Sequence, residues 1–305
     1  MQPATIEPPP NGGVAVHHHG GFELAIYAAA DPTRERPSQD RAMASLDDGQ
    51  ALLAVADGAG GHNSGGQAAT ITIAAIERAA AGANRDGGAL RHAILDALER
   101  ANREVLDLGD GAATTLASAI VVDSQVRTFH VGDAMVLVVG GRGSVRLATP
   151  PHSPVGYAVE AGVLEPEEAM HHEDRHLVSN VVGDLDMRVE VRAPIRMRPH
   201  DTVLVASDGL YDNLHLEEIA ERIRRRDLET VARELAETCT QRMTAPAESE
   251  PCKPDDLSFI LLRRERKRRA TRRKPTPSRS PSRSPLPSPS PSPGEDPTTQ
   301  EEPSA

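Results

Sequence analysis

Apolar residues recur at helical spacing in two long stretches near the middle of the chain. In residues 65–83, Ile71, Ala75 and Ile76 share one face. In residues 89–108, a longer apolar face repeats mostly at steps of three and four residues. Both stretches are therefore predicted to be amphipathic helices, and two further helices are predicted at residues 216–224 and 228–242.

Short apolar runs with the character of strands fill most of the remaining chain. Four of them occupy residues 118–122, 126–131, 135–139 and 144–147, and the turn formers Asp-Ser, Gly-Asp and Gly-Gly-Arg-Gly separate them. That rhythm predicts an antiparallel meander rather than βαβ units. Another strand, at residues 202–206, precedes the last two helices. Helices segregated from antiparallel strands indicate an α+β fold built in layers.

Four aspartates stand beside apolar runs in a way that suggests chemistry. Asp57, Asp133 and Asp208 each follow a run, and Asp255 precedes one. An acid in that position lies at the rim of a sheet, where it reaches solvent and ligand. Carboxylate oxygens are the ligands that Mg²⁺ and Mn²⁺ prefer. The pattern therefore predicts one divalent-metal site.

Composition divides the chain into a central domain and two terminal segments. Residues 1–21 are rich in Pro and Gly and are predicted to be a flexible arm. Residues 263–305 begin with a basic run and continue with Ser-Pro and Arg-Ser repeats, a composition that predicts a disordered tail. Residues 152–175 have little periodicity, which is typical of a surface loop.

Charge and cysteine content argue against several classes of protein, namely nucleic-acid-binding, disulfide-rich and membrane-spanning proteins. The tail holds eleven of the 34 basic residues and five of the 45 acidic ones, which leaves 23 and 40, or a formal charge of −17, before it. So acidic a domain is a poor candidate for binding a phosphate backbone. Two cysteines indicate no disulfide framework, and no apolar stretch is long enough for a signal or a transmembrane helix. We expect a cytoplasmic protein.

The residues around the acids carry a more specific signal. Asp-Gly-Ala-Gly-Gly-His begins at Asp57, and Ala-Ser-Asp-Gly-Leu-Tyr-Asp-Asn surrounds Asp208. With Val-Gly-Asp ending at Asp133, Asn-Val-Val-Gly from Asn180 and Asp-Asp-Leu-Ser from Asp255, these motifs resemble the metal-dependent protein phosphatase family (PPM, type 2C) over about residues 22–262. The resemblance implies two packed antiparallel sheets flanked by helix pairs. It also implies hydrolysis of phosphoserine and phosphothreonine in proteins by a hydroxide that bridges two Mn²⁺ or Mg²⁺ ions.

The resemblance also implies a set of metal ligands. Asp57 would bridge the two ions, the carbonyl of Gly58 would bind the second, and Asp208 and Asp255 would hold the first. Asp133 matches the residue that, with Asp208, binds a third ion in many bacterial members. The usual Ser-Arg after that position is Ala-Met here.

Three further positions complete the implied site. Asp40 matches the acid of the N-terminal motif, in which Gln39 replaces the usual Glu, so metal affinity is expected to be lowered. His62 matches the general acid, since imidazole can protonate a leaving oxygen near neutral pH. The phosphate-binding arginine is displaced, because Glu35 occupies its usual place, and Arg36 is the predicted substitute.

Alternative functions follow from the same residues. The displaced arginine and Gln39 favour a pseudophosphatase that binds a phosphoprotein without turnover, whereas the complete ligand set favours catalysis. A third hypothesis is that the protein is a phosphatase that acts on small phosphoesters. The acids Asp174, Asp212 and Asp256 are interpreted as surface residues. The basic tail is predicted to tether the enzyme to an acidic partner, nucleic acid or an anionic membrane surface, or else to act as a solubilising extension.

Overall fold

A computed structural model describes residues 4–10, 12–59, 64–82, 87–224, 226–247 and 250–265. Within this part of the chain, two large antiparallel sheets face each other and helices cover their outer sides. The first sheet has the strand order β1-β4-β5-β8-β9-β12, with β13 also pairing β9. Its strands are β1 (Ala4–Ile6), β4 (Arg41–Asp47), β5 (Gln50–Ala56), β8 (Leu116–Val122), β9 (Gln125–Val131), β12 (Glu190–Val191) and β13 (Ile195–Arg196).

The second sheet has the order β11-β10-β14-β15-β3-β2. Its strands are β11 (Val145–Ala148), β10 (Met135–Val139), β14 (Thr202–Ala206), β15 (Leu257–Arg264), β3 (Phe22–Ala29) and β2 (Ala15–His19). A small ladder joins β6 (Gly58–Ala59) to β7 (Ala113–Thr114). The α+β sandwich expected from the sequence is therefore the observed fold.

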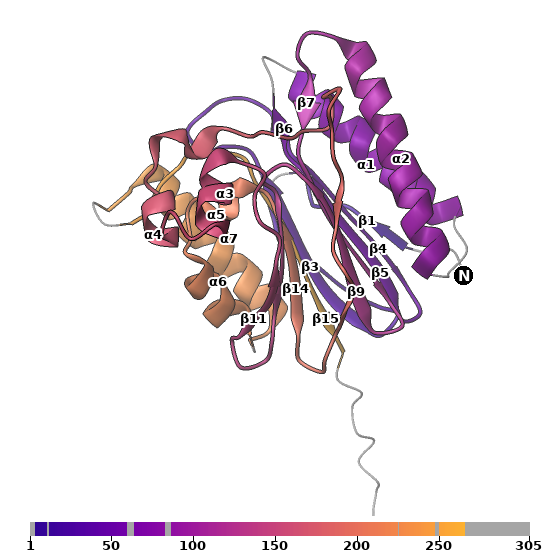
Figure 1. Ribbon diagram of the computed structural model, residues 1–305. Helices are drawn as coiled ribbons and strands as arrows, with labels where there is room; N and C mark the ends of the chain where they lie inside the picture. The colour runs from indigo at the N-terminus through magenta and orange to yellow at the C-terminus, as the bar shows by residue number, and fades with distance from the viewer. Residues whose placement is uncertain are drawn as a thin grey trace, which may run out of the picture. The chain divides into compact units, whose positions relative to one another are not determined.

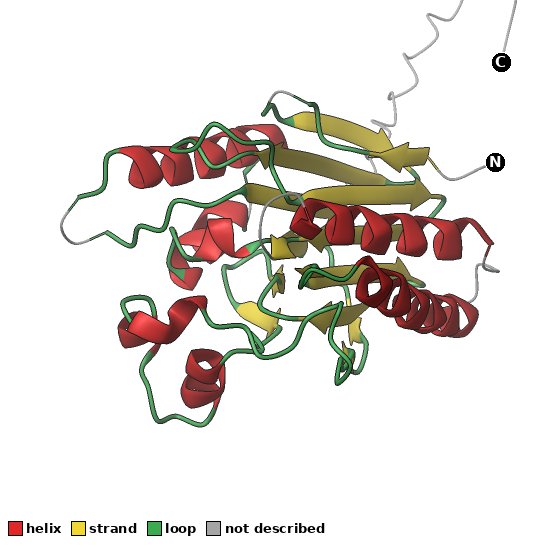
Figure 2. Ribbon diagram, turned by 90° about the horizontal axis from the view of Figure 1, so that it is seen from above, coloured by secondary structure: helices red, strands yellow, loops and turns green. Residues whose placement is uncertain are grey.

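Helix pairs cover the two outer faces. Figure 1 shows α1 (Ser64–Gly82) and α2 (Gly87–Leu108) along one side of the strands, with α6 (Leu216–Ile223) and α7 (Leu228–Thr244) on the other. The short helices are α3 (Pro154–Glu160), α4 (Pro166–Ala169), α5 (Asp208–Tyr211) and the 3₁₀ turn η1 (Glu173–His176). Figure 2 shows the same helices in red and the strands in yellow, seen from above. No helix in the described ranges is both long and apolar enough to cross a membrane.

The central strands, such as β5, are mostly apolar because both of their faces are buried. In β5, Leu53 and Val55 point into the core between the sheets, whereas Leu52 and Ala54 pack against the α1–α2 layer. Successive side chains of a strand point to opposite faces, so a strand covered on both sides has no polar face. These strands therefore appear in the sequence as short apolar runs, and each run ends where the chain leaves the core.

The structure differs from the sequence expectations in three places. The four strands from residue 116 to 148 are not one meander, because β8 and β9 lie in the first sheet and β10 and β11 in the second. Strands buried on both faces carry no pattern that tells which sheet they join. The segment expected to be a flexible arm supplies β1 and β2, which pair with β4 and β3. The region 152–175 forms the short elements α3, α4 and η1 rather than an extended loop.

Candidate metal centre

Five aspartates gather at one end of the sandwich because the strand ends that carry them meet there. Asp40 directly precedes β4 and Asp57 directly follows β5, and these strands pair with Arg41 opposite Ala56. Asp133 lies where the chain crosses from β9 to β10. Asp208 begins α5 just after β14, and Asp255 stands two residues before β15. Antiparallel pairing of β10, β14 and β15 puts the start of β10, the end of β14 and the start of β15 at the same edge.

Two glycines permit the close backbone contacts that join these segments. A Cβ on Gly209 would stand 2.0 Å from the carbonyl oxygen of Asp256. A Cβ on Gly58 would stand 2.4 Å from the carbonyl carbon of Gly65. Only glycine fits at both positions. Gly209 thereby brings α5, with Asp208 at its start, against the segment that carries Asp255.

The carboxylates of this cluster raise one another's pKa values. Burial, followed by the negative charges of four neighbouring acids, raises the pKa of Asp57 well above its usual range; the four are Asp40, Asp208, Asp255 and Asp133. Burial and the charge of Asp256 raise the pKa of Asp40 to about 7. Burial and the charge of Asp208 raise the pKa of Asp133 to about 8 and that of Asp255 to about 6. Asp57 is therefore in electrostatic contact with all four other acids.

The buried carboxylate oxygens fit a divalent cation. Both side-chain oxygens of Asp40 and Oδ1 of Asp208 are buried and lack a well-formed hydrogen bond in the described part of the chain, although Ser207 and Ser258 lie close enough to the Asp40 carboxylate to lower its pKa. Buried charges are normally paired or bound to metal, since an uncompensated carboxylate costs several kcal/mol. Hard oxygen donors in this number match Mg²⁺ or Mn²⁺. The cluster is therefore a candidate site for the metal ions that the sequence predicted.

Lys253 provides a positive charge in the middle of this cluster. Its Nζ contacts Asp208 Oδ2 and lies 2.8 Å from Asp212 Oδ2 and 3.5 Å from Asp255 Oδ2. Burial lowers the pKa of Lys253, but the charges of Asp208 and Asp212 outweigh it and raise that pKa above its usual range. The ammonium group thus shares carboxylate oxygens with the candidate metal site.

Two side chains of the Asp208 motif hold this arrangement in place. Asn213 is fully buried, donates to the carbonyl of Lys253 (2.9 Å) and accepts from the Lys253 amide (2.9 Å). Its Nδ2 also donates to the carbonyl of Gly209 (3.0 Å). The hydroxyl of Tyr211 donates to the carbonyl of Asp133. The motif therefore positions its neighbours as well as supplying a ligand.

Arg36 reaches the cluster from the loop before β4. Its Nη1 donates to Asp256 Oδ2 at 2.8 Å, and Asp256 is only 3% exposed. Asp256 also accepts from the amides of Asp31 and Gln39, at 2.8 and 2.7 Å. Arg34, by contrast, pairs with Asp31 and remains 65% exposed. Of the two arginines, only Arg36 is anchored beside the candidate metal ligands.

His130, His152 and Glu190 form a second group of ionisable residues, which contacts the backbone just before Asp133. His152 Nδ1 accepts from the Gly132 amide (3.1 Å) and from Asn180 Nδ2 (2.7 Å), so its proton is assigned to Nε2, which donates to Glu190 (3.3 Å). The neighbouring His130 packs on it with ring centroids 4.3 Å apart. Both nitrogens of His152 are engaged, so in this structure the group holds Gly132, although the ligand atoms of His130, His152 and Glu190 also lie within 4.8 Å of one another, close enough to share a metal ion.

The structure brings together most of the site residues that the sequence predicted. Asp40, Asp57, Gly58, Asp133, Asp208 and Asp255 lie at the same end of the sandwich. His62 falls outside the described residues, as do Gly60 and Gly61. Interpreting Asp256 as a surface acid was wrong, because it is buried beneath Arg36, and Asp212 is a partner of Lys253. Sequence reasoning also missed Lys253, although it is the only lysine before residue 267 in a chain rich in arginine.

Comparisons with known proteins agree with this geometry. Residues 32–246 match the model of the family described as protein phosphatase 2C. Protein phosphatase PhpP of Streptococcus pneumoniae is 28% identical over 177 residues, which cover 56% of this chain and 72% of that protein. The serine/threonine phosphatase of S. agalactiae has a similar fold, with a TM-score of 0.70 at 24% identity, covering 80% of this chain and all of that one. The catalytic domain of the phosphatase PstP, in complex with two manganese ions, has a TM-score of 0.64 at 23% identity over 79% of this chain and 97% of its own.

Proposed function

The chain belongs to the protein phosphatase 2C family, and from that premise we propose that it hydrolyses phosphoserine and phosphothreonine in proteins with Mn²⁺ or Mg²⁺ as cofactor. The observation that carries this proposal is the gathering of five aspartates, with unpartnered buried oxygens, at one end of the sandwich. The comparisons add nothing in favour of a binding module without turnover, which the displaced arginine and Gln39 alone suggested.

Asp40, Asp57, Asp208 and Asp255, with the carbonyl of Gly58, are the proposed ligands of two ions. Asp133 and Asp208 are available to a third. When bound, such ions lower the pKa of water and neutralise charge on the phosphoryl oxygens. The acids are suited to this because the single positive charge of Lys253 compensates only part of their combined negative charge. Metal binding should release the protons that the raised pKa values hold on them near neutral pH.

Arg36 is the proposed phosphate-binding residue. A guanidinium can donate two parallel hydrogen bonds to phosphoryl oxygens, and its contact with Asp256 uses only Nη1 and restricts the side chain. With 29% of its side chain exposed, Arg36 can still reach a substrate phosphate. The Asp256 carboxylate acts as a positioning group, because it also fixes the backbone at Asp31 and Gln39.

His62 is the proposed general acid for the leaving serine or threonine oxygen. This role rests on its place in the Asp-Gly-Ala-Gly-Gly-His motif alone. We further propose that the protein acts in the cytoplasm. The basic tail that follows the domain is proposed to bring the enzyme to an acidic partner, nucleic acid or an anionic membrane surface.

Phosphate release from a phosphothreonine peptide tests the proposal. Release should require Mn²⁺ or Mg²⁺, stop with a chelator, and fall by at least about 1000-fold in an Asp208→Asn variant, since one ligand of the pair of ions is lost. An Arg103→Ala variant, altered at an exposed position of α2, should be unchanged. Folded protein that binds the phosphopeptide but releases no phosphate with either metal would refute catalysis. A strong preference for a small aryl phosphate would indicate a different substrate class.

A further inference from the structure

A basic cavity lies at the opposite end of the second sheet from the acid cluster. It has a volume of about 810 Å³ and is lined by the turn after β10, the segment before β14 and the last residues of β15. The acid cluster is at the other ends of the same strands. Asp201 lines the cavity and stands seven positions before Asp208 in the acid cluster. At about 3.3 Å per strand residue, the two places are roughly 20 Å apart.

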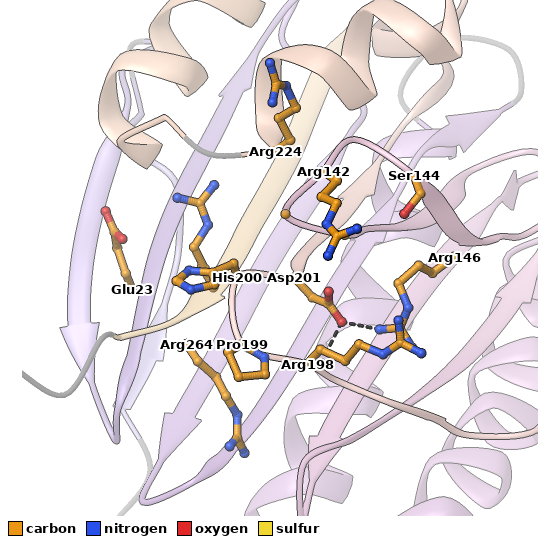
Figure 3. A pocket seen from close by; sticks show the side chains of 13 residues that line it. Glu23, Arg142, Ser144, Arg146, Arg198, Pro199, His200, Asp201, Arg224 and Arg264 are labelled. Atoms are coloured by element: carbon orange, nitrogen blue, oxygen red, sulfur yellow. Dashed lines mark hydrogen bonds and ion pairs between the residues drawn. The ribbon is translucent and has the colours of Figure 1, made fainter.

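The cavity concentrates positive charge in a domain that is otherwise acidic. Six arginines line it against two acids, a formal charge of +4, although Arg224 is also paired with Glu221 outside the lining. The arginines are Arg142, Arg146, Arg198, Arg224, Arg263 and Arg264. Arg146 neutralises Asp201, and both are drawn with Arg142 and Arg198 nearby in Figure 3. The second acid, Glu23, lies at the left edge of Figure 3, away from Asp201 and Arg146.

Several of these guanidinium groups have no carboxylate partner. Arg142 and Arg198 are exposed and form no ion pair with any residue in the described ranges. Arg263 donates to the Thr202 hydroxyl and to the carbonyl of Ile223, which are neutral groups, and the carboxylates of Glu23 and Asp227 compensate its charge only through space. Like charges held together in one cavity repel each other, and a bound anion would relieve that repulsion. Arg142 and Arg198 are therefore the groups most available to such an anion.

The lining also indicates which kind of anion fits. No Phe, Tyr or Trp is among the residues that line the cavity, and the imidazole of His200 is the only aromatic ring in that lining, so the arginines rather than a stacking surface dominate it. Arginine forks match phosphate oxygens in geometry as well as charge. The volume is in the range of small-molecule sites and far exceeds a single phosphate. The free arginines come from two separate segments, so a ligand with several linked phosphates would engage both.

We propose that this cavity, the arginine pocket, binds a linear oligophosphate chain, either free or as the triphosphate of a nucleotide. The recognised part is the phosphate chain, whichever source supplies it. This site is separate from the acid cluster and does not depend on phosphatase activity. Arg142 and Arg198 make the deciding contacts, and Arg263 contributes charge from the strand end.

Isothermal titration of the metal-free full-length chain tests the proposal with three probes: tripolyphosphate, ATP and orthophosphate. Tripolyphosphate and ATP should bind one site with affinities within about threefold of each other, and orthophosphate at least tenfold more weakly. An Arg142→Ala/Arg198→Ala variant should bind tripolyphosphate about 100-fold more weakly, because each lost charge-assisted contact is worth about tenfold. The affinity of an Arg142→Lys/Arg198→Lys variant for tripolyphosphate should lie between those of the unaltered chain and the alanine variant. Lysine keeps the positive charge but lacks the two parallel donors of the guanidinium group.

The matched control is Arg100→Ala/Arg103→Ala, which removes the same charge from exposed positions of α2 and should bind like the unaltered chain. Equal losses in both alanine variants would mean that net charge alone attracts the anion and would overturn the proposal. So would the absence of binding to the unaltered chain, equal affinity for orthophosphate, or binding of ATP alone. Because no metal is present, failure of this test leaves the phosphatase proposal untouched, and failure of catalysis leaves this one untouched.

Discussion

Replacing Lys253 by methionine should strengthen metal binding. The ammonium group contacts Asp208 and lies 2.8 Å from Asp212 and 3.5 Å from Asp255. Asp208 and Asp255 are proposed metal ligands, so the lysine and a metal ion compete for the same negative oxygens. Methionine keeps the length and apolar body of the side chain and removes only its charge.

The size of the effect follows from what the lysine contributes to the metal-free state. A hydrogen bond to a charged group contributes about 1.5–3 kcal/mol, and a metal ion must displace the ammonium from at least one carboxylate. Without the lysine, Mn²⁺ should therefore bind about 10- to 100-fold more tightly. The metal-free variant should also unfold more easily than the unaltered chain, since Asp208 and Asp212 lose their positive partner. Saturating Mn²⁺ should remove that difference in stability.

Electron paramagnetic resonance of free Mn²⁺ measures the affinity directly, and calorimetry measures the melting temperature with and without metal. Arg103→Met serves as the control, because it removes one positive charge from an exposed site on α2. Mn²⁺ affinity within about twofold of the unaltered chain would refute the competition. Equal tightening in the control would assign the effect to net charge instead.

Three further predictions follow. Arg36→Ala should lower kcat/KM for a phosphothreonine peptide by about 100-fold, with partial recovery in Arg36→Lys, because a donor to the phosphoryl group is lost; unchanged kinetics would remove Arg36 from the site. Folded pKa values of about 7 for Asp40 and about 8 for Asp133 exceed the unfolded values, so the folded metal-free chain holds extra protons. Its melting temperature should fall by about 5 °C between pH 6.5 and 8, by calorimetry, and a rise would contradict these shifts. Gly209→Ala should destabilise the fold in urea by about 2 kcal/mol or more and weaken Mn²⁺ binding, whereas Gly82→Ala, whose Cβ would meet nothing within 4 Å, should do neither.

Local pattern was enough to predict the four longest helices and most of the central strands of the two sheets. The periodicity of residues 89–108 predicted α2. In β5 and β14, successive side chains point alternately into the core between the sheets and against a helix layer, so both sets are buried and the runs are apolar. The acids at the strand ends were visible as candidate ligands because strand ends are where a polar side chain interrupts such a run. The identity of the family followed from short motifs around Asp57 and Asp208.

Only the tertiary structure decided which distant segments meet. Strands buried on both faces do not show which sheet they join, so the crossover between β9 and β10 at Asp133 was not predicted. Lys253 and the arginine pocket were missed for the same reason, because a charged side chain has no periodicity and its partners lie far away in sequence. By itself, the sequence determined the long helices, the central strands and the acids beside those strands, since each depends on neighbouring residues. The packing of the two sheets decided the contact of Lys253 with Asp208 and the gathering of the arginines, since burial and charge act through space.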